Sequence, residues 1–168
     1  MRVTDSTILA YIAGFLDGDG SIFFQIIPRR DYKQKFEIRS SIAFYQKTNN
    51  IEILSWLKNY FGCGYIRRRE SGVSDYTIVE SKEVKRILLL LQQYVRLKKK
   101  QVELGLQILE KLENKKTTQD FLEICKLVDK FKDINYSKKR KITYETVSKF
   151  FTPVETEAKA ESLVLKQG

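Results

Sequence analysis

The residues best suited to chemistry are two carboxylates, Asp17 and Asp19, in the stretch IAGFLDGDGS at positions 12–21. Each acid precedes a glycine, and both lie where an apolar, helix-like run ends. Acids at the C-terminal end of a helix oppose the helix dipole, and clustered carboxylates repel one another unless a cation binds between them. Their oxygens suit a hard cation such as Mg²⁺, which also binds phosphate.

Two other interpretations of these acids were weighed on the pattern alone. An EF-hand loop begins with the same D-x-D-x-S spacing, but it requires glycine and glutamate where this chain has Ile22 and Pro28, so we exclude it. A helix end with solvated acids stays open at this point, because the bare pattern does not distinguish it from a cation site.

Composition limits the available chemistry. The 168 residues include no histidine, so hydrolysis would have to rest on carboxylates, lysine, metal ions and bound water. A net charge of +10, from 31 Lys and Arg against 21 Asp and Glu, favours nucleic acid as the partner over an anionic membrane surface. No apolar run is long enough to cross a bilayer. The two cysteines, Cys63 and Cys125, suggest neither a disulfide framework nor a zinc site, which indicates a reducing, intracellular setting.

Hydrophobic periodicity predicts the elements that must position the two acids. A helix capped near Asp5 carries them and ends at the glycines 18 and 20. The pattern then predicts two strands, a helix, two strands and further helices. The expected strands are 22–27, 36–45, 65–69 and 75–80; the later helices start near 49, 84, 102, 121 and 144. One domain at 1–152 and a loose, polar tail at 153–168 are expected.

A stripe of small residues runs along the first helix. Ala10, Gly14 and Gly18 are spaced at i, i+4 and i+8 and therefore share one face. Such a stripe lets two helix backbones approach closely. Two copies crossing there would bring their C-terminal acids together. The sequence contains no internal repeat that could supply the second helix.

The segment IAGFLDGDG resembles the nine-residue motif of the LAGLIDADG homing endonucleases. Five positions match the motif name letter for letter, namely Ala13, Gly14, Asp17, Asp19 and Gly20. Other segments are similar to the single-motif, homodimeric, intron-encoded branch typified by green-algal chloroplast enzymes. These segments are Gln46-Lys47-Thr48, Gly64-Tyr65-Ile66-Arg67, Val73-Ser74-Asp75-Tyr76, Leu97-Lys98 and Ser137-Lys138. The likeness covers roughly residues 6 to 150.

The resemblance implies a fold and an assembly. The fold would be α+β, with αββαββα order, a curved antiparallel four-stranded sheet forming a DNA-binding saddle, helices on the other face and additional C-terminal helices. The motif helices of two subunits would pack at a homodimer axis, which implies a long, pseudo-palindromic DNA target. The interface residues implied are Ala10, Ala13, Gly14, Asp17 and Gly18, and Asp17 would have a structural role, capping or packing there.

The resemblance also implies an activity, namely a metal-dependent double-strand break with short 3′ overhangs that promotes intron homing. Asp19 and the Gly18 carbonyl would bind Mg²⁺, a site that Mn²⁺ or Ca²⁺ could occupy in a crystal. Gln46 and Lys98 would order water and offset phosphate charge. Asn50 stands where the family pattern has a basic residue, so it could orient water but not offset charge. From the residues alone, Gln46 could equally be a strand-end hydrogen bonder and Lys98 a solvated lysine.

A four-stranded antiparallel sheet can place one face along the major groove, and arginine and glutamine suit guanine and adenine there. An ordinary charged surface is the alternative for the outward residues of this sheet. The residues with the parity or loop position for base contact are Gln25, Arg29, Tyr32, Lys33, Glu37, Arg39, Arg67, Arg69, Asp75 and Thr77. The segment with Ser137, Lys138 and Lys139 resembles a family segment that contacts the DNA backbone.

Two rival functions remain open from the sequence. One is a splicing maturase of the same fold that binds intron RNA, and the other is a non-enzymatic, sheet-based DNA-binding dimer. Double-stranded DNA and a second copy are the expected partners, with no membrane and no small-molecule substrate. Abundant lysine, isoleucine, asparagine and tyrosine suggest an AT-rich genome, and together with the resemblance this favours an organelle such as the chloroplast.

Overall fold

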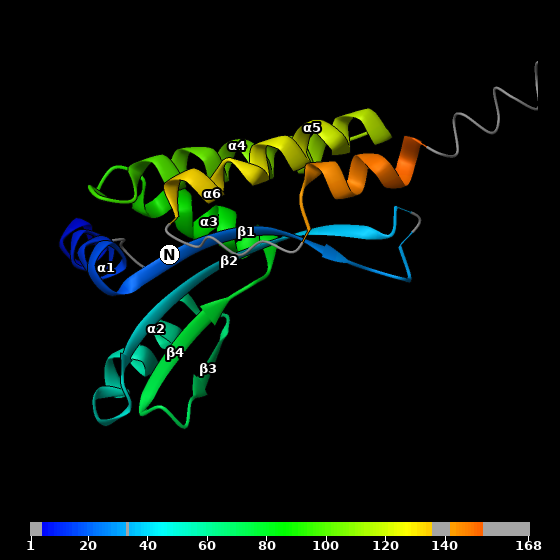
Figure 1. The fold of residues 1–168 in the computed structure, drawn as a ribbon. Helices are drawn as coiled ribbons and strands as arrows, with labels where there is room; N and C mark the ends of the chain where they lie inside the picture. The colour runs from blue at the N-terminus through cyan, green and yellow to red at the C-terminus, as the bar shows by residue number, and fades with distance from the viewer. Residues whose placement is uncertain (1–4, 33, 136–141, 153–168) are drawn as a thin grey trace, which may run out of the picture.

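The chain has the αββαββα order that the sequence predicts, followed by C-terminal helices (Figure 1). The computed structural model describes residues 5–32, 34–135 and 142–152. The elements are α1 (Ser6–Asp19), β1 (Gly20–Pro28), β2 (Phe36–Lys47), the 3-10 turn η1 (Thr48–Asn50), α2 (Glu52–Phe61), β3 (Tyr65–Arg68), β4 (Val73–Ile78), α3 (Ser81–Leu91), α4 (Lys99–Asn114), α5 (Thr118–Asp129), α6 (Phe131–Ile134) and a helix at 144–152.

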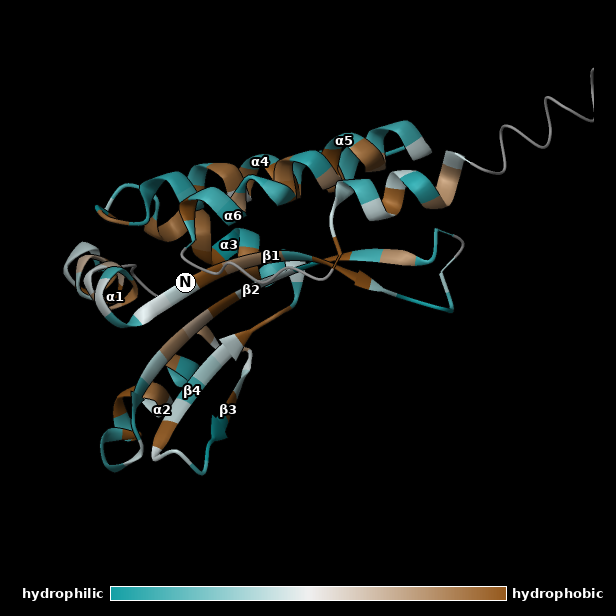
Figure 2. Ribbon diagram, viewed as in Figure 1, coloured by the Kyte–Doolittle hydropathy of each residue, from teal (hydrophilic) through white to brown (hydrophobic). Residues whose placement is uncertain are grey.

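The four strands form one antiparallel sheet in the order β1-β2-β4-β3. The sheet bends strongly, and α1 to α5 lie on one side of it, which leaves the other face open and concave (Figure 1). Contacts of α1 and α3 with β2, of α4 and α5 with β1 and of α2 with β4 fix that arrangement. The hairpin tip between β1 and β2 is hydrophilic, whereas the middle of both strands is rich in hydrophobic residues (Figure 2).

Local sequence signals explain where several helices begin and end. The Asp5 side chain caps α1 by accepting a hydrogen bond from the Thr7 amide, 2.8 Å away. Thr117 and Asp120 form a reciprocal capping box at the start of α5. Gly62 ends α2 with φ at 73°, a left-handed conformation that favours glycine.

The core lies between the convex face of the sheet and the helices. The strands contribute Ile22, Phe24, Ile38, Ile42 and Ile78, which are buried, and Ile66, which is partly buried against them. Phe24 stacks on Phe131 with ring centroids 5.0 Å apart. A Cβ at Gly105 would lie 2.8 Å from the Phe24 ring, so glycine allows α4 to approach β1 closely. Each large buried side chain contributes about 1.5–3 kcal/mol of hydrophobic stabilisation.

Some predicted boundaries are wrong by a few residues. β4 begins at Val73 and ends at Ile78, earlier than the predicted 75–80, because the turn closes with the Gly72 amide donating to the Arg69 carbonyl. Gly72 has φ at 78°, and the chain re-enters the sheet immediately after it, with Val73 opposite Lys47. Within the described ranges, no helix combines the length and apolar character that crossing a bilayer would require.

Candidate active site and nucleic-acid interface

The end of α1 opens into a hollow that joins two of the predicted catalytic residues. Asp19 is the last residue of α1 and is exposed, and the chain turns into β1 where the Gly20 amide donates to the Leu16 carbonyl. The residues lining the hollow are Ala10, Tyr11, Gly14, Phe15, Asp19, Gln46 and Ile53. The structure therefore brings Asp19 and Gln46 together beside the small-residue stripe of α1.

Lys98 reaches the same end of α1 from the connection between α3 and α4. Its Nζ donates to the Asp17 carbonyl at 2.7 Å. Burial lowers the pKa of the Lys98 ammonium, whereas the negative charges of Asp17 and Asp19 act in the opposite direction. The ammonium therefore lies in the field of both motif acids, at the negative end of the helix dipole.

The Asp17 carboxylate is engaged within its own subunit. Its two oxygens accept hydrogen bonds from the backbone amides of Arg96, at 2.6 Å, and Lys98, at 3.0 Å. The side chain is thus tied to the connection between α3 and α4. The resemblance implied a structural role for Asp17, capping or packing at the dimer interface, but it did not indicate these two amides of the same subunit.

Gln46 and Asn50 occupy different surroundings. Gln46 is half-buried in β2, and its Oε1 accepts from the Lys47 amide at 2.9 Å. Asn50 is exposed at the end of η1 and is not among the described residues that line the hollow. Gln46 is therefore the better placed of the two to act beside Asp19.

The donor set fits a hard cation only as half of a site. Each subunit offers the Asp19 carboxylate and the carbonyls of the last turn of α1, which are oxygen ligands of the kind that Mg²⁺ prefers. Among the described residues, no three His, Cys, Asp or Glu side chains are grouped closely enough to hold a metal ion. A complete oxygen shell would need donors from outside this chain, such as a second subunit, water or phosphate.

The small-residue stripe of α1 is open to solvent, as expected for a helix contact. A Cβ built on Gly14 or Gly18 would meet no atom within 4 Å, so packing inside the subunit does not require glycine at either position. Ala10 is also exposed. Ala13 is 0% exposed, so its assignment to the interface is wrong: it lies off the i, i+4 stripe and faces the core.

An exposed aromatic pair extends the open face of α1. Tyr11 in α1 and Trp56 in α2 meet edge to face with ring centroids 6.0 Å apart, and they remain 56% and 38% exposed. Together with Thr7, Ile8 and Ile53 they line a largely apolar hollow beside the first one.

The first half of the concave face has the predicted polar residues. Gln25 pairs with Arg39 across β1 and β2, and both are exposed. Further along, Arg29 forms an ion pair with Glu37 at 2.6 Å, and its guanidinium lies 5.2 Å from the centroid of the Tyr32 ring. These side chains form a polar surface along the hairpin with planar groups suited to base edges.

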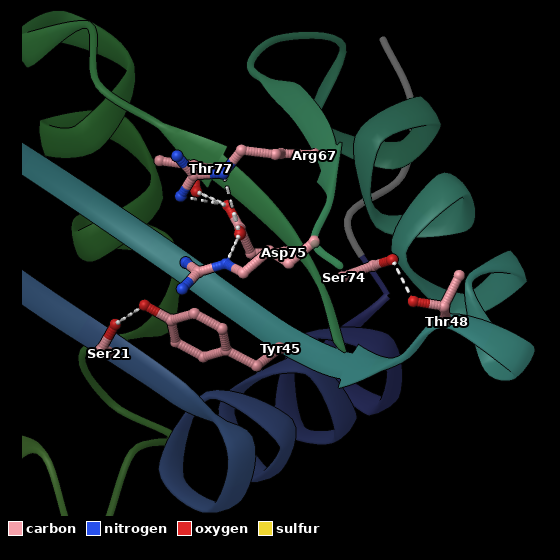
Figure 3. A network of polar contacts seen from close by, with 8 residues as sticks. Ser21, Tyr45, Thr48, Arg67, Ser74, Asp75 and Thr77 are labelled. Carbon is pink, nitrogen blue, oxygen red and sulfur yellow. Dashed lines mark hydrogen bonds and ion pairs between the residues drawn. The ribbon is translucent and has the colours of Figure 1, made fainter. Parts of the chain in front are cut away.

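The second half of the concave face is organised around Asp75 (Figure 3). Its carboxylate accepts hydrogen bonds from Arg69 at 2.7 Å, from Arg67 at 3.2 Å and from the Thr77 hydroxyl at 2.9 Å. Burial alone would raise the pKa of Asp75, but the bonds from Arg69, Thr77 and Arg67 outweigh it and lower that pKa below its usual value. The two guanidinium groups stay largely exposed above the acid.

Asp75 and Thr77 were expected to be exposed for base contact, and this expectation is wrong. Both have the predicted parity, but the Asp75 side chain is 1% exposed because Arg67 and Arg69 cover it. Thr77 is 9% exposed and donates to the same carboxylate. The two residues therefore support the arginines from below.

Comparisons with known proteins agree with this geometry. A sequence model of the family described as LAGLIDADG endonuclease matches residues 12–108. The DNA endonuclease I-CreI of Chlamydomonas reinhardtii is 45% identical over 140 residues, which are 83% of this chain and 85% of that protein. The DNA endonuclease I-CvuI of Chlorella vulgaris is 37% identical over 143 residues, 85% of this chain and 89% of that protein.

The chain belongs to the LAGLIDADG endonuclease family. A crystal structure of I-CvuI in complex with the I-CreI target, in the presence of Mg and with the DNA not cleaved, superposes with a TM-score of 0.84 at 35% identity. The match covers 89% of this chain and 95% of that one. The predicted family and fold are thereby confirmed.

Part of the predicted DNA surface of this LAGLIDADG protein lies outside the described residues. Four residues lie outside the described part of the chain, namely Lys33, Ser137, Lys138 and Lys139. The structure does describe both ends of the segment that holds the last three. Asn135 donates to the Ile22 carbonyl of β1 at 2.9 Å, and the Tyr144 amide donates to Asp129 at 2.8 Å.

A polar contact between Ser21 and Tyr45, next to the motif of this LAGLIDADG protein, was not predicted from the sequence. The Tyr45 and Ser21 hydroxyls lie 3.1 Å apart (Figure 3). The Arg69 guanidinium lies 5.7 Å from the centroid of the Tyr45 ring. Neither Ser21 nor Tyr45 was assigned a role from the sequence. The strand register, which places Gly20 opposite Phe44, is the information that would have brought Ser21 and Tyr45 together.

Proposed function

We propose that this chain is a site-specific DNA endonuclease that acts as a homodimer and makes a metal-dependent double-strand break with short 3′ overhangs. The supporting observation is the hollow in which the exposed Asp19 and Gln46 adjoin the open Gly14 stripe. The relatives named above are DNA endonucleases, and I-CvuI was crystallised with DNA targets. Intron homing is the biological role that this activity would serve.

The homodimer follows from what one subunit lacks. A break in both strands needs two hydrolytic centres, and each chain offers one exposed motif carboxylate. Two α1 helices that cross at Ala10, Gly14 and Gly18 would place both Asp19 residues near one axis. Such a two-fold assembly would read a pseudo-palindromic target.

The chemistry would be hydrolysis of one phosphodiester on each strand. A divalent ion held there would supply the means to lower the pKa of an attacking water and to neutralise charge on the leaving oxygen. Asp19 and the Gly18 carbonyl would hold that ion, and the amide of Gln46 would orient water in the hollow. The Lys98 ammonium would offset phosphate charge, with the negative charges of Asp17 and Asp19 favouring its protonated form. Asn50 would contribute water orientation, as the resemblance implies.

Sequence recognition would come from the concave face. Arg67 and Arg69 are suited to guanine edges and Gln25 to adenine. Base recognition would extend along the β1–β2 hairpin through Arg29, Tyr32, Lys33, Glu37 and Arg39. Contacts to phosphate would come from Ser137, Lys138 and Lys139. Specific affinity should therefore fall with salt by roughly 0.9 log units per decade for each phosphate contact.

The proposal extends to the metal and to the cellular setting. The oxygen-only donor set supports Mg²⁺, and crystals of I-CvuI were studied with Mg and with Ca. The two curated relatives come from green algae, which supports an organelle such as the chloroplast as the site of action.

Cleavage selection from a randomised palindromic DNA library tests the proposal. The full chain should enrich one long duplex sequence in Mg²⁺ and cut both of its strands, and EDTA should abolish cutting. Enriched binding without cutting in Mg²⁺ or Mn²⁺ would indicate a DNA-binding dimer instead. If the chain bound intron RNA but neither bound nor cut any duplex, a maturase would replace the endonuclease.

A further inference from the structure

Asp17 lies two residues before Asp19, the proposed metal ligand, but its side chain contacts the connection between α3 and α4. Its carboxylate accepts from the Arg96 and Lys98 amides at 2.6 and 3.0 Å. The Nζ of Lys98 returns to the Asp17 carbonyl at 2.7 Å. Asp17 thus contacts Lys98 at its backbone and at its ammonium, although the two residues are 81 positions apart in sequence.

These contacts fix a segment that has little other regular structure. Arg96 to Lys98 connect α3 to α4, and Lys98 is the residue at the N-terminal boundary of α4. Hydrogen bonds from backbone amides to a carboxylate are charge-assisted and about twice as strong as neutral ones. The neighbouring Val95 is buried, whereas Leu97 between the two bonded amides is 78% exposed. The two amide bonds therefore determine how this connection lies against α1.

We propose that Asp17 is a positioning residue, which acts by holding the 96–98 segment against α1 so that Lys98 is directed to the hydrolytic centre. This inference rests on the proposed function, in which Lys98 offsets phosphate charge beside Asp19. It assigns the two motif acids different tasks: Asp19 binds the ion, and Asp17 places the lysine.

The arrangement suits a side chain that is costly to order. A free lysine has many rotamers, and fixing them costs conformational entropy. In the folded subunit this cost is met before DNA binds, because Asp17 holds both ends of the lysine. A misplacement of about 1 Å at a reacting centre can reduce a rate roughly a hundredfold. Loss of the Asp17 carboxylate should therefore slow cleavage without weakening DNA binding.

A double-mutant cycle on the full-length dimer tests the proposal. Asp17→Asn, Lys98→Gln and the double variant are compared with the wild type in single-turnover cleavage of the selected duplex in Mg²⁺. Asp17→Asn should reduce the cleavage rate constant about 10- to 100-fold and leave the dissociation constant within about twofold. If Asp17 acts through Lys98, the double variant should be no slower than Lys98→Gln. Multiplied losses, or a wild-type rate for Asp17→Asn, would overturn the proposal.

Asp5→Asn is the matched control, because Asp5 is also an acid of α1 that binds a backbone amide, but at the other end of the helix. It should cleave at the wild-type rate. Asn still caps helices well, so the control changes charge on the same helix without freeing the 96–98 segment.

Amide hydrogen exchange gives a second measurement that needs no DNA. In the wild type, the Arg96 and Lys98 amides should be protected, and Asp17→Asn should accelerate both while Asp5→Asn leaves them unchanged. Unprotected amides in the wild type would refute the proposal even if Asp17→Asn failed to fold. If the wild type cut no duplex, the proposed function would fail, and exchange alone would decide whether Asp17 holds this segment.

Discussion

The two functional regions of the subunit differ in how complete they are. At the end of α1, the exposed Asp19 carboxylate and the open face of Gly14 adjoin a hollow. No other part of the described chain fills this hollow. On β3 and β4, the buried Asp75 already has its partners in Arg67, Arg69 and Thr77 (Figure 3). The first region is half of a site, whereas the second is assembled in the single subunit.

The two regions therefore differ in what must still be ordered or supplied when DNA binds. The arginines around Asp75 are already held in the folded subunit, so in the proposed function they would lose little further freedom when DNA binds. In the proposed function, the hydrolytic end would be completed by association, because the oxygens that it lacks would come from other molecules. Changes at the first region should therefore affect cleavage or assembly, and changes at the second should affect affinity and stability.

The largest effect is expected from Asp19→Asn. The variant keeps the shape of the side chain but removes the charge that would hold the metal, so cleavage should fall about a thousandfold or more. Specific DNA binding should remain, measured by gel shift in Ca²⁺ on the selected duplex. Asp133→Asn, an exposed acid on α6, is the control and should cleave normally. Loss of binding together with cleavage would contradict the separation of the two regions.

Gly14→Leu tests whether the hydrolytic end depends on association. The monomer should fold, because nothing lies within 4 Å of a Cβ at this position, but the side chain should block close approach of a second α1. Sedimentation should give the subunit mass, and cleavage should fall at least about a hundredfold, since one subunit lacks half of the metal ligands. Glu110→Leu on the exposed side of α4 is the matched control. A Gly14→Leu variant that stays dimeric and active would refute the packing argument.

Local signals in the sequence were sufficient for the elements and for the face of each strand. Asp5, Thr117 and Gly62 mark helix ends through interactions within a few residues, and these appear in the fold. Alternation along each strand indicated which residues share one face of the sheet, because the side-chain period of a strand is two. The stripe of Ala10, Gly14 and Gly18 was likewise predictable from the spacing within one helix.

The remaining features depend on contacts between distant segments. Parity placed Asp75 on the concave face, but only the pairing of β3 with β4, which sets Arg67 opposite Asp75, buries the acid. The link from Asp17 to Lys98 joins residues 81 positions apart and follows no local pattern. Ala13 was assigned to the interface because it belongs to the motif. Helix geometry instead directs its side chain into the core.

Arg69→Ala examines the assembled region, with a smaller effect. A guanidinium that contacts a base edge should contribute about 1–3 kcal/mol, so specific affinity should fall roughly 5- to 150-fold and discrimination should relax at one base position. The slope of log affinity against log salt should stay unchanged, because a base contact releases no phosphate counterion. A slope reduced by about one would place Arg69 on the backbone instead. Lys132→Ala, on the exposed side of α6, is the control.

Asp75→Asn should have the smallest effect on DNA binding and a measurable one on folding. The pKa of Asp75 is lowered in the folded protein, so its charge stabilises the fold above the usual aspartate value of 3.8, and this contribution is lost as pH falls through the lowered pKa. At neutral pH the variant should lose about 1–3 kcal/mol in the free energy of unfolding, because charged hydrogen bonds are replaced by weaker ones.

Urea unfolding between about pH 7 and pH 2 measures this dependence. The difference between wild type and Asp75→Asn should be constant near neutral pH and should shrink below about pH 4, where the wild-type carboxyl becomes protonated and resembles the amide. Asp31→Asn, an exposed acid in the β1–β2 loop, should show no such difference. If the difference persisted at the lowest pH, the stabilisation would come from the shape of the side chain and not from its charge. Arg67 and Arg69 would then be held less firmly than the geometry implies, and the contrast with the end of α1 would weaken.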